Sequence, residues 1–144
     1  RRETAYEVVS KELKENADKV NAILAANDSL AWGTIDALSE ARLTGKIMVG
    51  GHDADLAACQ RIVSGTQLLT IYKPINKLVV KTLEVVEALN DGSSLDYDLT
   101  IDDGTYQIPY FINDVTLVTK DNIDETVIKD GFHLKEDVYR EVGN

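Results

Sequence analysis

The chain has 144 residues, the usual length of one domain, and its 44% hydrophobic and 28% charged residues are typical of a globular protein. Acidic residues outnumber basic ones by 25 to 15, and the resulting net charge of −10 argues against nucleic-acid or anionic-membrane partners, which bind basic surfaces. No apolar stretch approaches the roughly 20 residues of a membrane span, and no signal-peptide pattern opens the chain. The single cysteine, Cys59, excludes an internal disulfide and favours a small core residue.

Amphipathic and apolar segments alternate along the first two thirds of the chain. Helical periodicity or helix-start signals predict helices over 3–18, 29–43, 55–64 and 75–90, and short apolar runs predict strands over 20–26, 46–51 and 66–73. We expect Asp28 or Ser29 to cap the second helix and Asp55 the third. The helix over 75–90 is apolar on several sides, which predicts that much of it is buried. This alternation predicts an α/β fold, an open, mainly parallel sheet with helices on both faces.

The pattern changes after residue 92. The segments 99–101 and 106–108 flank Asp103-Gly104, which predicts a β-hairpin. Residues 116–119 resemble one more strand, followed by a short helix capped by Asp121 or Asn122. A last helix is expected to begin near Leu134.

Three polar residues stand at the carboxyl ends of the predicted parallel strands, where ligands bind in open α/β sheets: Asn27, Asp53 and Lys73. Their amide, carboxylate and ammonium groups together supply donors and acceptors that suit a polyol or a sugar. The alternative is that Asn27 and Asp53 are turn or capping residues and that Lys73 is a solvated strand end. Trp32, early in the next helix, has two corresponding interpretations: a platform for a sugar face or a packing residue.

Catalytic and metal sites find little support in the sequence. Asp53 and Asp55 lie on one loop, whereas glycoside hydrolysis requires carboxyls on both sides of the bond. His52 lacks further nitrogen or sulfur ligands nearby, because His133 is far along the chain. The acidic segment 96–104 lacks the glutamate that closes an EF-hand loop. We therefore expect a protein that is not an enzyme and has no catalytic residue, cofactor or metal.

Longer segments carry a family resemblance over nearly the whole chain: LAANDSLAWGTIDAL, GGHDADLAACQRIVSGTQLLTIYKPI and VTKDNIDETVIKDGF. They closely resemble the D-xylose-binding proteins of bacterial sugar ABC transporters, which have the type I periplasmic-binding-protein fold. The resemblance implies that Asn27, Asp53 and Lys73 form hydrogen bonds with the sugar hydroxyls. Two residues depart from the family pattern, since His52 replaces a glutamine and Trp32 a small residue.

The resemblance also implies a function. We expect an extracytoplasmic solute-binding protein, in the periplasm or at the outer face of the cell membrane, that binds a monosaccharide, D-xylose, between two lobes and presents it to an ABC permease. The alternative is a sugar-sensing subunit that docks on a membrane histidine kinase or chemoreceptor. A third possibility is a LacI-type repressor core, which shares the fold.

The chain matches only the C-terminal half of a family member. By analogy, residues 1–73 belong to the C-terminal lobe, 74–112 cross the hinge and contribute to the N-terminal lobe, and 113–144 return to the C-terminal lobe. A sheet that lacks the remainder of its two-lobe protein exposes apolar faces. We therefore expect a complementary N-terminal half to accompany this chain.

Overall fold

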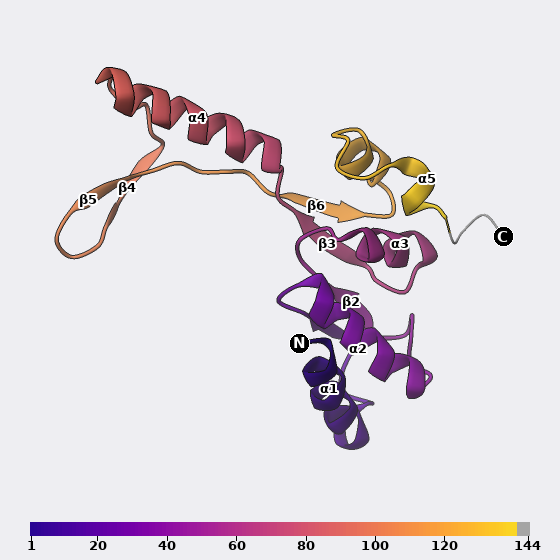
Figure 1. Cartoon of the computed structure of the whole chain (residues 1–144). Helices are drawn as coiled ribbons and strands as arrows, with labels where there is room; N and C mark the ends of the chain where they lie inside the picture. The colour runs from indigo at the N-terminus through magenta and orange to yellow at the C-terminus, as the bar shows by residue number, and fades with distance from the viewer. Residues whose placement is uncertain (141–144) are drawn as a thin grey trace. The chain divides into compact units, whose positions relative to one another are not determined.

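The computed structural model describes residues 1–140 and divides the chain into two compact units (Figure 1). Among the described residues, the first unit comprises Arg1–Tyr72 and residues 116–140, and the second is Lys73–Val115. Within residues 1–140, no helix combines the length and the apolar character that crossing a membrane requires.

The first unit is built on a four-stranded sheet. Its strands are β1 (Ala22–Leu24), β2 (Met48–Gly50), β3 (Leu69–Tyr72) and β6 (Thr116–Thr119), and its helices are α1 (Arg2–Asn16), α2 (Asp28–Glu40), α3 (Leu56–Ser64), the π-helical turn η1 (Asp124–Ile128) and α5 (Lys135–Val138). The strand order is β1-β2-β3-β6, with the first three strands parallel and β6 antiparallel to β3. The predicted alternation and the open, mainly parallel sheet are therefore confirmed.

Two hydrophobic clusters form the core of this unit. Residues of α1 and α2, among them Leu13 and Leu38, pack with Val49 of β2. Residues of α3, η1 and α5 pack with Tyr72 of β3 and Val118 of β6. Right-handed crossovers that advance in one direction, from β1 to β2 to β3, place α2 and α3 on the same face of the sheet.

The other face of the sheet carries exposed apolar side chains. The register brings Leu24, Gly50 and Leu69 together on this face, and Leu24 is 81% exposed. Leu117 of β6 is about half exposed. Among residues 1–140, the helical cover of the sheet thus lies on the face opposite Leu24. The expectation of helices on both faces is corrected for this part of the sheet, because the crossovers from β1 to β3 all advance in one direction.

The second unit contains α4 (Ile75–Asp91) and a hairpin of β4 (Leu99–Asp102) and β5 (Gln107–Tyr110). The hairpin was predicted and is confirmed, with Gly104 at φ +90° in its turn. The expectation that much of α4 is buried is wrong, because no residue of this helix is buried. Within this unit, the hairpin and the residues around Phe111 leave many apolar side chains of α4 exposed.

The expected helix caps are also corrected. Asn27, not Asp28 or Ser29, caps α2. Asp55 occupies the capping position of α3, but its side chain makes no capping hydrogen bond. Before η1, the Asn122 side chain bonds Thr119 and Leu117 rather than the helix start. For Asp28 the reason is tertiary, because its carboxylate accepts hydrogen bonds from Gln67, Thr70 and the Asp55 N–H, and such bonds compete with local capping.

Candidate functional site

The strand ends of the first unit define the candidate site. Asn27 lies three residues after the end of β1, and Asp53 lies three residues after the end of β2. The two loops are joined directly, because the Asp28 N–H donates to the His52 carbonyl at 2.9 Å. The structure therefore places Asn27 and Asp53 on neighbouring loops. Lys73 follows β3 directly, is exposed and is the first residue of the second unit, so its part in the same site stays a prediction.

Asn27 has a structural role that leaves part of its amide available. Its Oδ1 accepts a hydrogen bond from the Leu30 N–H at 2.9 Å, which caps α2. Its Nδ2 group has no partner within residues 1–140. The cap and ligand interpretations are thus compatible, since the cap uses the oxygen while Nδ2 still offers donors to a hydroxyl.

Asp53 lies in an unusual backbone segment. Its φ is +102° and that of Ala54 is +56°, in the region that residues with side chains rarely adopt. The Asp53 N–H donates to the Ile71 carbonyl at 2.9 Å, which ties the loop to β3. Its carboxylate lies 2.9 Å from His52 Nδ1, and both side chains are more than a third exposed. The Asp53 carboxylate is therefore accessible at the strand ends while its backbone is fixed.

Asp28 is the most connected polar side chain beside these loops. It is 1% exposed, and Oδ1 accepts from Gln67 Nε2 at 2.9 Å. Its Oδ2 accepts from Thr70 Oγ1 and from the Asp55 N–H, each at 2.9 Å. Burial raises the pKa of the Asp28 carboxyl, and these hydrogen bonds oppose that shift. One buried carboxylate thus joins the loop after β1, the loop after β2 and strand β3.

The surroundings of this carboxylate are tightly packed. A Cβ at Gly51 would lie 2.0 Å from Asp28 Oδ1, so this position has no room for a side chain. Arg61 donates hydrogen bonds to Gln67 Oε1 at 3.0 Å and to the Asp28 carbonyl at 3.2 Å.

The half-exposed ring of Trp32 is stacked by the Arg2 guanidinium, 3.8 Å from its centroid. Trp32 thus has a cation on its ring, an arrangement that the sequence did not indicate.

His133 reaches the same loop from the far end of the unit. Its Nε2 lies 2.7 Å from the Ala54 carbonyl and donates to it, because a carbonyl oxygen only accepts. Sequence reasoning set His133 aside on account of its distance along the chain. The signal that it missed is the return of the chain to this unit after residue 115, which brings distant residues to the strand ends.

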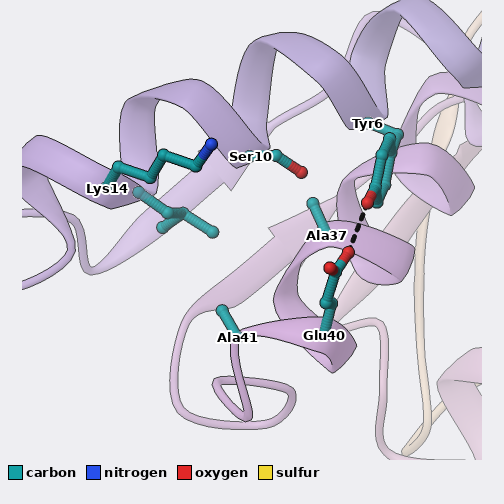
Figure 2. A pocket seen from close by; sticks show the side chains of 7 residues that line it. Tyr6, Ser10, Lys14, Ala37, Glu40 and Ala41 are labelled. Atoms are coloured by element: carbon teal, nitrogen blue, oxygen red, sulfur yellow. Dashed lines mark hydrogen bonds between the residues drawn. The ribbon is translucent and has the colours of Figure 1, made fainter.

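Two hollows compete for the role of ligand site. An open hollow of about 340 Å³ lies beside the strand ends and is lined by Leu24, Ala25, Ala26, Gly51, His52 and Ile71. A second hollow, of about 250 Å³, lies between α1 and α2. Figure 2 shows the Tyr6 hydroxyl of α1 directed toward the Glu40 carboxylate of α2, to which it is hydrogen-bonded. This bond raises the pKa of Tyr6.

The second hollow lies away from the candidate residues. Glu40 ends α2, whereas Asn27 caps its start, which separates them by about 20 Å along the helix axis. The hollow beside the strand ends is contiguous in sequence with Asn27 and Asp53, and it is the better match to a ligand site in an open α/β sheet.

Neither a metal-binding group nor a reactive thiol is found among the described residues. No group of three or more His, Cys, Asp or Glu side chains within residues 1–140 is arranged to hold a metal ion. Cys59 is fully buried, and burial raises its pKa to about 12, so its thiol is a core group rather than a nucleophile.

Comparison with known proteins assigns the family. A family model described as a periplasmic binding protein domain matches residues 1–94. The chain belongs to this family. The remaining comparisons agree with the assignment.

Two curated relatives of this chain carry the same name. The chain is 43% identical over 137 residues to the D-xylose-binding periplasmic protein of Haemophilus influenzae and 40% identical over 136 residues to that of Escherichia coli. The alignments cover 95% and 94% of this chain but 41% of each relative. The chain therefore spans about two fifths of the length of these relatives.

A solved structure confirms the fold. The carbohydrate transporter solute-binding protein of Chloroflexus aurantiacus, solved in complex with D-glucose, superposes with a TM-score of 0.84 at 28% sequence identity. The match covers 95% of this chain and 41% of that protein. The predicted periplasmic-binding-protein fold is thus confirmed, with this chain as one part of it.

Proposed function

We propose that this chain is the C-terminal part of an extracytoplasmic solute-binding protein that binds D-xylose between two lobes and presents it to an ABC permease. The observation that carries this proposal is the 43% identity to the D-xylose-binding periplasmic protein of Haemophilus influenzae over nearly the whole chain. The sugar complex of the Chloroflexus aurantiacus protein supports a monosaccharide as the ligand class. The role is binding, without chemistry on the sugar.

Asn27, Asp53 and Lys73 are the proposed ligand-binding residues. The Asp53 carboxylate would accept hydrogen bonds from sugar hydroxyls, and the Lys73 ammonium and the Asn27 Nδ2 would donate to them. Bonds to charged groups are the stronger kind. Backbone hydrogen bonds within the protein hold the loops that carry Asn27 and Asp53, and such preorganisation lowers the entropic cost of binding.

The proposal includes the lobe assignment. Residues 1–73 and 113–144 would belong to the C-terminal lobe, and 74–112 would cross the hinge to the N-terminal lobe. The division of the described chain near residues 72 and 115 supports this assignment. A complementary N-terminal half would cover the exposed apolar side chains of α4 and of the uncovered sheet face. Calorimetry tests the requirement for that half: a sharp two-state transition of this chain alone would contradict it.

Transport is favoured over signalling as the downstream role. The Chloroflexus aurantiacus structure is that of a transporter solute-binding protein, which supports an ABC permease as the partner. The relatives reported above lend no comparable support to docking on a sensor kinase. An ABC permease is therefore the proposed reader of the sugar-bound state.

Isothermal titration calorimetry tests the function. D-xylose, ribose, arabinose and glucose would each be titrated into this chain together with its complementary half. We expect clear binding heat with D-xylose and weaker heat with the other sugars, because a site built to pair hydroxyls rejects analogues that leave its polar groups unpaired. Absence of heat with every pentose would overturn the proposal.

A further inference from the structure

We infer that Asp28 is a positioning residue of the proposed sugar site, one that acts through Thr70 and the backbone of residues 54–55 to fix the loop presenting Asp53. This inference rests on the proposed function for its ligand. Asp28 itself does not contact the sugar in this account, because its carboxylate is buried and already engaged by protein donors.

The connection is a continuous chain of hydrogen bonds. The Ala54 N–H donates to Thr70 Oγ1 at 3.1 Å, and Thr70 Oγ1 lies 2.9 Å from Asp28 Oδ2. Because the Ala54 N–H occupies an acceptor position of the hydroxyl, the hydroxyl proton is directed to the carboxylate. The Asp55 N–H reaches the same oxygen at 2.9 Å. Two successive backbone groups after Asp53 are therefore anchored on one carboxylate.

The loop needs such anchors because its backbone is unfavourable. Asp53 and Ala54 both have positive φ, and non-glycine residues persist in that region only when the surroundings over-determine them. The Ile71 carbonyl fixes the Asp53 N–H, and His133 fixes the Ala54 carbonyl at 2.7 Å. Losing the Asp28 anchor would leave the loop free to relax to ordinary φ values, which would turn the Asp53 carboxylate away from its present direction.

The chemistry at position 28 is that of an acceptor. Donors from Gln67, Thr70 and Asp55 converge on the two carboxylate oxygens, so an amide at this position would direct its own N–H groups toward a donor. Helix capping does not explain the residue, because Asn27 already caps α2. A buried carboxylate is also weak evidence for a stabilising role. The hydrogen-bond geometry indicates instead that the Asp28 carboxylate fixes the conformation of the loop that carries Asp53.

The test uses a matched pair of variants at the middle of the relay. Thr70→Val removes the hydroxyl with little change of shape, and Thr70→Ser keeps it. Each variant would be prepared in this chain together with its complementary half and compared with the unmodified protein. The measurements are the dissociation constant for D-xylose, amide hydrogen exchange at Ala54 and Asp55, and the thermal midpoint.

We expect Thr70→Val to weaken D-xylose binding by about tenfold or more and to speed exchange at both amides, while Thr70→Ser stays within about threefold of the unmodified protein. A folded Thr70→Val protein with unchanged affinity would overturn the inference, even if its thermal midpoint falls, since a merely structural role predicts that pattern. Asp28→Asn provides a second route to the same comparison if Thr70→Val does not fold.

Failure of the proposed function gives a different result. If the unmodified protein binds no D-xylose, the proposed function fails, and hydrogen exchange alone decides the role of Asp28 in the loop. Faster exchange at Ala54 and Asp55 in Thr70→Val but not in Thr70→Ser then supports the anchor. Equal exchange in all three proteins overturns it.

Discussion

The strand-end loops of the first unit and helix α4 of the second unit are opposite cases. In the loops, the buried polar groups around Asp28 all have partners within the same unit. On α4, large apolar residues such as Leu83 and Val86 are more than half exposed, and no residue is buried. The polar groups of the first region are thus paired within their own unit, whereas the second region exposes an apolar surface to solvent.

This difference separates what the chain determines by itself from what it leaves to a partner. Hydrogen bonds between the loops specify the positions of Asn27 and Asp53 without any other chain. The apolar pattern of α4 indicates only that something should cover it. Under the proposed function, the loops bind the ligand and α4 contributes to the second lobe.

The largest expected effect concerns the ligand residues. In the chain with its complementary half, Asp53→Ala should weaken D-xylose binding by about 2–4 kcal/mol, because it leaves sugar hydroxyls without their charged acceptor. Asp55→Asn is the matched control on the same loop and should change affinity little, since Asp55 contributes its backbone N–H to the network. Equal losses in the two variants, measured by titration calorimetry, would refute these roles.

The next effect compares two glycines, one from each region. Gly51→Ala should lower the free energy of unfolding by about 1–3 kcal/mol, because the added Cβ collides with the Asp28 carboxylate. Gly104→Ala in the hairpin turn meets no neighbouring atom and should cost about 1 kcal/mol, from its positive φ alone. Urea unfolding measures both. A larger cost at Gly104 would show that the network around Asp28 yields more easily than its geometry indicates.

A substitution on α4 tests whether a partner covers the helix. With the complementary half present, Leu83→Ala should cost about 2 kcal/mol or more if the partner buries this side chain. Glu87→Ala, an exposed position of the same helix, should stay within about 0.5 kcal/mol and serves as the control. If Leu83→Ala is equally silent in denaturant unfolding, α4 remains exposed and the proposed complement does not cover it.

The smallest expected effect is a pH dependence from Asp28. Burial raises the pKa of this carboxyl in the folded state above its usual value of 3.8, so the folded protein holds the proton more tightly than the unfolded chain. The contribution to stability is therefore greatest below pH 3.8 and is lost as the pH rises through the folded-state pKa. Asp28→Asn should lack this component. Parallel curves of unfolding free energy against pH for the two proteins would contradict the assignment.

The elements of this fold are largely predictable from local patterns. Apolar runs and helical spacing located β1 to β3 and the helices between them. The predicted parallel sheet also indicated that Asn27 and Asp53 lie on neighbouring loops, because the carboxyl ends of adjacent parallel strands meet at the same edge of a sheet.

The roles of Asp28 and His133 were not predictable in this way. The side-chain partners of Asp28 lie 39 and 42 residues further along, and His133 bonds a carbonyl 79 residues before it. No local pattern encodes such pairings, and the position of Asp28 before a helix indicates only a cap. Exposure of α4 escaped prediction for a related reason: periodicity shows that a face is apolar without showing what packs on it.

Amide hydrogen exchange with and without D-xylose would locate the ligand on this chain. In the chain with its complementary half, we expect slower exchange on sugar addition in the loops around Asn27 and Asp53. Exchange in the residues that line the hollow between α1 and α2, around Tyr6 and Glu40, should not change (Figure 2). Protection confined to that hollow, or absent from both loops at saturating sugar, would contradict a D-xylose site at the strand ends.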